Sequence, residues 1–178
     1  MSRKKRLRIY LCSGMEKSEN LGAGWRDKIT PFLEELDFEV WNPVQFEADQ
    51  LRGLHPHRLP SSVTDSRTGK QFTPSYWHDL KRAKEKQYYD RFLKYMRRIR
   101  EYDLNLVENE MDYLLVYWND GTGNGAGSHA EIEMAHRVGL PVYCVSVTDV
   151  PAWLHPCIDE MFYTMEELKE FLEKEIKG

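Results

Sequence analysis

Apolar residues along the chain gather in short blocks, each closed by residues that form turns. The block at 7–12 stops at a Ser-Gly pair, and a second block stops after Trp41 at an Asn-Pro pair. Two later blocks, at 113–118 and 142–147, are almost continuously apolar, which is typical of parallel strands buried on both faces. The pattern therefore predicts four strands of one parallel sheet.

Between and after these blocks, apolar residues recur every three or four positions, as they do on one face of a helix. Such stretches predict helices over about 25–36, 75–106, 128–138 and 164–176. A proline costs a helix interior about 3 kcal/mol unless it lies in the first turn, so we expect the first of these helices to start nearer Pro31.

Strands that alternate with helices predict the α/β class, with a doubly wound parallel sheet and helices on both faces. Residues 45–75 contain prolines, serines and a glycine but little periodicity, so we expect no regular structure in them. We expect one domain over residues 1–178, in which about 45–100 form an insertion that includes a long basic helix. Ligands of such sheets bind at the carboxyl ends of strands, here in the loops that follow the first three predicted strands.

The composition supports a folded core, since 41% of the 178 residues are hydrophobic. The longest apolar run, 113–118, is far shorter than the roughly 20 residues of a membrane-spanning helix, and no apolar leader follows the basic start. We therefore expect a cytoplasmic protein without a membrane partner. Three cysteines without a CxxC pair predict reduced thiols, and His55 and His57 have no third ligand at a useful spacing, so we expect no metal site.

Charge is distributed unevenly, although 25 Lys and Arg against 29 Asp and Glu give a formal net charge of −4. The segment 81–100 holds nine basic and two acidic residues, a local +7 that leaves −11 for the rest. This segment suits a protein that binds nucleic acid, but long cationic side chains ordinarily form a solvated helix face. Because the whole protein is also acidic, we regard nucleic acid as a disfavoured partner, which the salt dependence of binding would test.

The segment 120–131 leaves an apolar block, passes four glycines and enters a predicted helix. Glycines let backbone N–H groups approach a ligand, and a helix N-terminus favours negative charge, so this loop suits a sugar, a phosphate or another anion. The glycine spacing matches the dinucleotide fingerprint only loosely, and no lysine follows it as in a Walker sequence.

Two acidic residues fall on the predicted inward faces of helices. Glu131 shares its side of a helix with Met134 and Ala135; alternatively, it forms a capping box with Ser128 and only satisfies a backbone N–H. Asp103 occupies the next apolar position of its helix, where an ionised carboxylate is costly unless it is bonded or faces a cleft. Alternatively, Asp103 forms a local cap or an ion pair with a nearby arginine. Both alternatives stay open.

Four pieces of the sequence point to a known family. They are Ile9-Tyr10-Leu11 followed by Ser13-Gly14, then Gly22-Ala-Gly-Trp25-Arg26, then Tyr102-Asp103-Leu104-Asn105 ahead of Asp112, and Gly127-Ser128-His-Ala-Glu131-Ile132 followed by Gly139-Leu-Pro141-Val142. Together these pieces resemble the nucleoside 2-deoxyribosyltransferase family and the related nucleotide N-glycosidases, over about residues 6–44 and 102–147. The resemblance implies a flavodoxin-like fold and an enzyme that acts on the N-glycosidic bond of a nucleoside or a nucleoside 5′-monophosphate.

In that family a glutamate attacks the anomeric carbon and displaces the base, and the resemblance places this nucleophile at Glu131. It implies that Tyr10 orients the nucleophile and that Asp103 contacts the base. The residues assigned to substrate binding, by the resemblance and by the glycine-rich loop, are Ser13, Gly14, Gly24, Trp25, Asp120, Gly125, Gly127 and Ser128. Gly125 stands where the family has a second aspartate, and Asp120 could replace that aspartate if the loop folds back.

The resemblance further implies a homo-oligomer whose neighbouring subunits complete each site, a small-molecule nucleoside or nucleotide as partner, and no cofactor. A carboxylate that stabilises an oxocarbenium-like centre and an acid that protonates the leaving group would supply the chemistry. Transfer to a second base and hydrolysis by water remain alternatives. A nucleotide-binding or signalling module of the same fold, without turnover and with Glu131 only as a cap, is the competing class of function.

Overall fold

The computed structural model describes residues 6–16, 18–45 and 59–177. The chain divides into two compact units, of which the first contains residues 1–47 and 103–178 and the second residues 48–102. The second unit nearly coincides with the segment that the sequence sets apart as an insertion, and the single domain over the whole chain stays a prediction.

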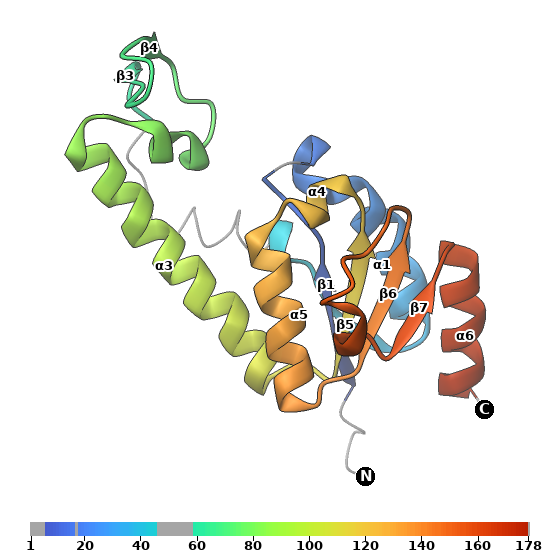
Figure 1. The fold of residues 1–178 in the computed structure, drawn as a ribbon. Coiled ribbons are helices and arrows are strands. Elements are labelled where there is room, and N and C mark those ends of the chain that lie inside the picture. The colour runs from blue at the N-terminus through green and yellow to red at the C-terminus, as the bar shows by residue number, and fades with distance from the viewer. Residues whose placement is uncertain (1–5, 17, 46–58, 178) are drawn as a thin grey trace. The chain divides into compact units, whose positions relative to one another are not determined.

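The first unit is built on a parallel sheet of five strands (Figure 1). In chain order the strands are β1 (Leu7–Cys12), β2 (Phe38–Trp41), β5 (Tyr113–Trp118), β6 (Val142–Ser146) and β7 (Glu160–Phe162). Their order across the sheet is β2-β1-β5-β6-β7, so the winding reverses between β1 and β5. The four predicted strands and the flavodoxin-like α/β class are confirmed, and β7 adds an edge strand that the apolar pattern does not show.

Helices cover both faces of this sheet. They are η1 (Glu19–Gly22), α1 (Ala23–Glu35), α4 (Asp120–Gly123), α5 (Ala126–Val138), η3 (His155–Cys157) and α6 (Met165–Lys177). Figure 1 shows α1 and α6 on one face and α5 on the other. No helix in the described ranges has both the length and the apolar content needed to cross a membrane.

The face under α1 and α6 holds a continuous apolar core. Ile9 and Leu11 of β1 pack there with Leu33 of α1 and Leu168 of α6, and all four are buried. Because successive residues of a strand point to opposite faces, the intervening Tyr10 points to the face that α5 covers. The alternation along β1 therefore decides which of its side chains can meet α5.

Helix α1 begins at Ala23, so the expected start nearer Pro31 is wrong. Pro31 lies inside the helix at an exposed position, where water can bond the backbone carbonyl that the missing N–H leaves free. Ile29 and Leu33, on either side of the proline, are buried and anchor the helix to the sheet. Core packing thus outweighs the local cost of the proline.

The second unit contains two short strands within residues 45–75, where no regular structure is expected. Its elements are the antiparallel pair β3 (Val63–Thr64) and β4 (Gln71–Phe72), η2 (Trp77–Arg82) and most of α3 (Lys86–Asn109), whose residues from Asp103 onward belong to the first unit. The hairpin turn is closed by Asp65, whose side chain accepts the backbone N–H groups of Arg67 and Thr68, and by Gly69 with a φ of 69°.

The long helix starts at Lys86, not near residue 75 as predicted. The Asp79 carboxylate accepts the backbone N–H groups of Ser75 and Tyr76 and so caps a separate 3-10 helix, η2. After η2 the backbone of Ala83 is extended, which separates η2 from α3. Leu80, which fits the helical spacing, instead packs in the small core of this unit.

Candidate functional site

Tyr10 and Glu131 meet on the face of the sheet that α5 covers. Tyr10 is wholly buried, and its phenolic oxygen donates a hydrogen bond to Glu131 Oε1 at 3.1 Å. Glu131 extends from α5 and is partly buried. Two residues that are far apart in the sequence are thus joined at one point, and they are the pair that the resemblance names as nucleophile and orienting tyrosine.

The start of α5 excludes the capping-box alternative for Glu131. Gly125 precedes the first helical residue, Ala126, so Ser128 is the third residue of the helix and not its cap. Glu131 consequently lies in the second turn, beyond the exposed N–H groups that a capping box would satisfy. Its carboxylate is held by Tyr10 instead.

Burial governs the ionisation of this pair. It raises the pKa of Glu131 above its ordinary value, against the opposing effects of the Cys12 thiol, the Tyr10 hydroxyl and the charge of Arg26. Burial also raises the pKa of Tyr10 well above its usual range, and the negative charges of Glu131 and Asp103 raise it further. Tyr10 therefore keeps its proton and remains a hydrogen-bond donor to the carboxylate.

Asp103 lies on the same side of the sheet as this pair. It is partly buried in the last part of α3, and its charge contributes to the raised pKa of Tyr10, which places it within electrostatic range of the phenol. The structure thus joins Tyr10 to Glu131 directly and places Asp103 within electrostatic range of Tyr10. The contact of Asp103 with a base stays a prediction.

Thr122 fastens the loop after β1 to the glycine-rich loop after β5. Its hydroxyl oxygen lies 2.9 Å from Ser13 Oγ and accepts the backbone N–H of Gly14 at 3.1 Å. A Cβ atom on Gly14 would lie 2.2 Å from the carbonyl oxygen of Gly121, and one on Gly125 would lie 3.4 Å from Gly14 Cα. The structure therefore gives Ser13, Gly14 and Gly125 a packing role, and their substrate contacts stay predictions.

Arg26 is a residue of the site that sequence reasoning missed. Its wholly buried guanidinium donates to four backbone carbonyl oxygens at 2.9–3.2 Å, those of Leu11, Ser13, Leu21 and Gly22. Arg26 thereby ties the end of β1 to the start of α1 and brings a positive charge near Glu131. The available signal was its place directly after Trp25 in one of the pieces that carry the family resemblance.

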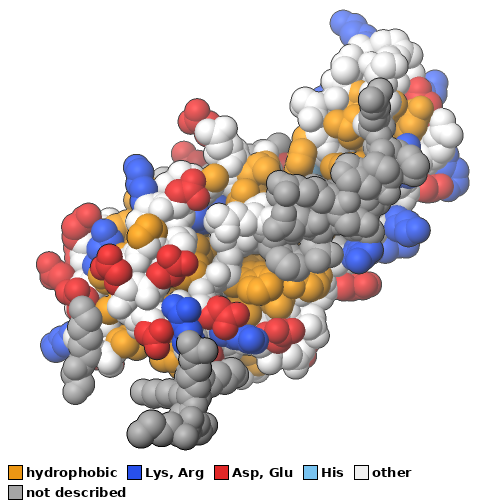
Figure 2. All heavy atoms as spheres, turned by 180° about the vertical axis from the view of Figure 1, so that it is seen from behind, with side chains coloured by type: hydrophobic (Ala, Val, Ile, Leu, Met, Phe, Trp, Pro, Cys, Tyr) orange, Lys and Arg blue, Asp and Glu red, His pale blue; other side chains and the backbone are white. Residues whose placement is uncertain are grey.

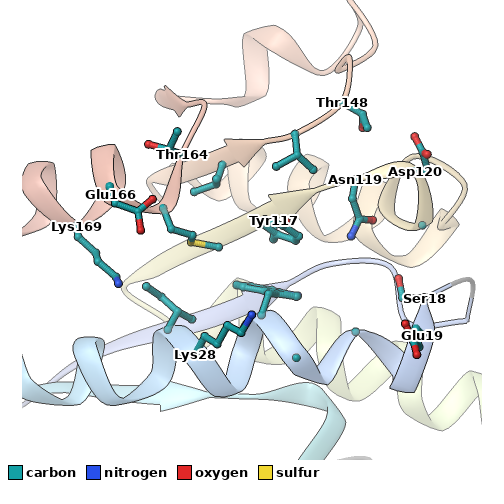
Figure 3. A pocket seen from close by; sticks show the side chains of 18 residues that line it. Ser18, Glu19, Lys28, Tyr117, Asn119, Asp120, Thr148, Thr164, Glu166 and Lys169 are labelled. Carbon is teal, nitrogen blue, oxygen red and sulfur yellow. The ribbon is translucent and has the colours of Figure 1, made fainter.

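Gly24, Trp25 and Asp120, predicted to bind substrate, line a cavity on the opposite face, between α1 and α6 (Figure 3). The Trp25 ring stacks on Tyr117 of β5, with ring centroids 5.2 Å apart, and both rings pack against the core of that face. The expectation that Trp25 shares a pocket with Glu131 is therefore wrong, because the sheet lies between them. Asp120 is exposed at this cavity, so the structure does not support the return toward Glu131 on which its replacement of the family aspartate would depend.

Ser128 and Gly127, the two remaining residues predicted to bind substrate, both lie in the first turn of α5 but differ in burial. Ser128 is buried, and its carbonyl oxygen lies 3.9 Å from Cys12 Sγ. Gly127 is exposed in the first turn of α5, and a Cβ atom there would meet no other atom within 4 Å. Space beside Gly127 is therefore open, and its role in binding substrate stays a prediction.

Within the described part of the chain, no three His, Cys, Asp or Glu side chains are grouped so that they could hold a metal ion. His55 and His57, which the sequence brings forward as a pair, lie outside the described residues.

Comparison with known proteins gives a structural relationship. No family model and no curated protein matches the sequence. Among solved structures, the chain is similar to a 2-deoxyribosyltransferase from the psychrotolerant bacterium Bacillus psychrosaccharolyticus, with a TM-score of 0.57 and 16% identity over 91% of this chain and 90% of that chain. At this identity the likeness establishes a shared fold, and it is the fold of an enzyme named for the family that the sequence resembles.

Proposed function

We propose that the protein is an enzyme that cleaves the N-glycosidic bond of a nucleoside or a nucleoside 5′-monophosphate, with Glu131 as the nucleophile. The observation that carries the proposal is the hydrogen bond from buried Tyr10 to the Glu131 carboxylate at the carboxyl end of β1. The fold shared with a 2-deoxyribosyltransferase supports glycosyl transfer from a nucleoside as the class of reaction.

The proposal gives different tasks to the two carboxylate oxygens of Glu131. Tyr10 holds Oε1, and Oε2 is proposed to attack the anomeric carbon. A bond then forms between Oε2 and that carbon, while the carbon–nitrogen bond breaks and its electron pair leaves with the base, which takes up a proton. Attack of water or of a second base on the same carbon releases Glu131 and completes hydrolysis or transfer.

Asp103 is proposed to contact the departing base. It is a partly buried carboxyl group on the Tyr10 side of the sheet. A carboxyl group there can accept or donate a hydrogen bond at the base edge and so lower the cost of charge on the leaving group. Tyr10 does not fill this role in the proposal, because its raised pKa keeps its proton on the oxygen that holds Glu131.

The decisive experiment incubates the purified protein with deoxynucleosides, ribonucleosides and their 5′-monophosphates, with and without an added free base, and follows the base by chromatography. Base release that depends on Glu131 is expected, and Glu131→Gln should reduce it at least 1,000-fold, roughly the loss found when an essential nucleophile is removed. A new nucleoside formed with the added base would identify transfer, and free sugar would identify hydrolysis.

Asp103→Asn serves as the companion variant. It should slow base release while the melting temperature stays within about 2 °C of the parent protein, since the change conserves shape at a partly buried position. Unchanged release by Glu131→Gln would overturn the nucleophile assignment. Tight nucleotide binding without release from any substrate would instead support the non-catalytic module.

A further inference from the structure

A cavity of about 840 Å³ lies on the face of the sheet covered by α1 and α6, at the carboxyl ends of β5 and β6. Its volume is within the range of roughly 300–1,000 Å³ that small-molecule sites occupy. The loops after β1 and β5 form one end of the cavity, and these strands flank the point where the winding of the sheet reverses. Doubly wound sheets bind ligands at that point, so the cavity lies where this architecture offers a site.

One wall of the cavity, formed by residues of β5, β6, α1 and α6, is apolar and aromatic. Trp25 and Tyr117 stack with an interplanar angle of 23°, and Ile29, Val145 and Met165 continue the surface. A planar ring can lie against such a wall without removing water from a charged group. The wall therefore suits a nucleobase.

Charged side chains stand in separate parts of the cavity (Figure 3). Lys28 from α1 and Lys169 from α6 extend into it from the two helices, whereas Glu19 and Asp120 lie at its other end, at the starts of η1 and α4. Ammonium groups attract phosphate, and carboxylates accept hydrogen bonds from sugar hydroxyls. Glu166 also lines the cavity one turn before Lys169 and offsets part of the positive charge, so both lysines are needed to favour an anion.

We propose that this cavity binds a nucleoside monophosphate. The phosphate lies between Lys28 and Lys169, the base lies against Trp25 and Tyr117, and the sugar hydroxyls point toward Asp120. The site is separate from Glu131, which lies on the other face of the sheet, and so the proposal holds whether or not Glu131 cleaves a glycosidic bond.

Calorimetric titration of the Glu131→Gln protein tests the proposal without turnover. The probes are adenosine 5′-monophosphate and adenosine, followed by the monophosphates of the other bases. The monophosphate should bind at least tenfold more tightly than the nucleoside, because charge-assisted hydrogen bonds to two lysines add to the stacking. Adding Lys28→Gln and Lys169→Gln together should weaken monophosphate binding by about tenfold or more and leave adenosine binding unchanged.

Two further variants locate the binding. Lys174→Gln removes a charge from the exposed side of the same helix and should leave both affinities unchanged. Gly24→Leu should block the cavity without disturbing the fold, since a Cβ atom on Gly24 meets nothing within 4 Å and leucine favours a helix. Its melting temperature should match that of the parent, and the monophosphate binding that the double-lysine change weakens should be lost.

Equal affinities for monophosphate and nucleoside would overturn the proposal, as would unchanged monophosphate binding in both the double-lysine variant and Gly24→Leu. Base release by the parent protein is measured separately, so the failure of one site does not imply the failure of the other.

Discussion

The Tyr10 hydroxyl can be removed with little other change by Tyr10→Phe, which makes it the most direct probe of the proposed nucleophile. Hydrogen bonds to charged groups contribute about 1.5–3 kcal/mol. The 3.1 Å separation between Tyr10 and Glu131 is longer than is usual for a hydroxyl donor, so we expect the lower end of that range. A loss of about 1.5 kcal/mol in the transition state corresponds to a roughly tenfold lower rate of base release.

The pH dependence of Tyr10→Phe provides a second, independent readout. The Tyr10 hydroxyl stabilises the ionised form of Glu131 and so lowers its pKa, against the larger effect of burial. Without the hydroxyl, this pKa must rise further, and the limb on which activity increases with pH should move to higher pH.

The assay measures base release by chromatography between pH 4 and 9 for the parent, Tyr10→Phe and Tyr143→Phe. The last of these removes a phenol from β6 of the same sheet and should leave both rate and profile unchanged. A Tyr10→Phe protein that keeps the parent rate and the parent pH profile would refute the role given to this hydrogen bond.

Three further predictions concern stability. Glu131→Gln should raise the melting temperature relative to the parent more at pH 8 than at pH 4. The pKa of Glu131 is higher in the folded than in the unfolded protein, so its carboxyl group contributes stability below the unfolded pKa. The parent protein loses this contribution as pH rises through the folded pKa, whereas the glutamine variant has no such loss. Thermal scans at the two pH values check this, and an equal effect at both would contradict it. Arg26→Met leaves four carbonyl oxygens without their donor, and each buried unsatisfied group costs about 1–3 kcal/mol. We therefore expect the free energy of unfolding, measured in urea, to fall by at least ~3 kcal/mol. A loss below ~1 kcal/mol would show that the loops rearrange freely. Gly14→Ala should cost about 1–3 kcal/mol through overlap with Gly121, whereas Gly127→Ala, in open space, should cost nothing; equal effects in urea unfolding would exclude the packing argument.

The sequence predicts those parts of the fold that depend on long apolar patterns. The buried strands give continuous apolar runs, so β1, β5 and β6 are found almost to the residue. The start of α1 could not be predicted, because the local cost of Pro31 is visible in the sequence while the burial of Ile29 and Leu33 is a property of the folded chain. The hairpin in the second unit depends on the side chain of Asp65 and on one glycine, which give no periodic signal.

The candidate site shows the same division. The resemblance brings Tyr10 and Glu131 forward, and the structure joins them by a hydrogen bond. Arg26 could not be predicted as a buried residue, since an arginine near the start of a helix is ordinarily exposed and nothing local shows that four carbonyl oxygens converge on it. The prediction that Trp25 shares a pocket with Glu131 is wrong for a related reason. Adjacency in the sequence does not show on which face of a sheet a helix will lie.

The end of β1 explains why the predicted substrate residues fall on two sides. Tyr10 faces α5, whereas Leu11 faces α1, and the loop that follows them meets the glycine-rich loop at Ser13 and Gly14. This junction is tightly packed. Thr122 bonds to both residues, and the backbone of Gly121 occupies the position that a side chain on Gly14 would need. Opening this junction would break the bonds to Thr122 and those of the buried guanidinium beside it. The two proposed positions, a substrate at Glu131 and a monophosphate in the cavity between α1 and α6, therefore require no rearrangement of the strand end.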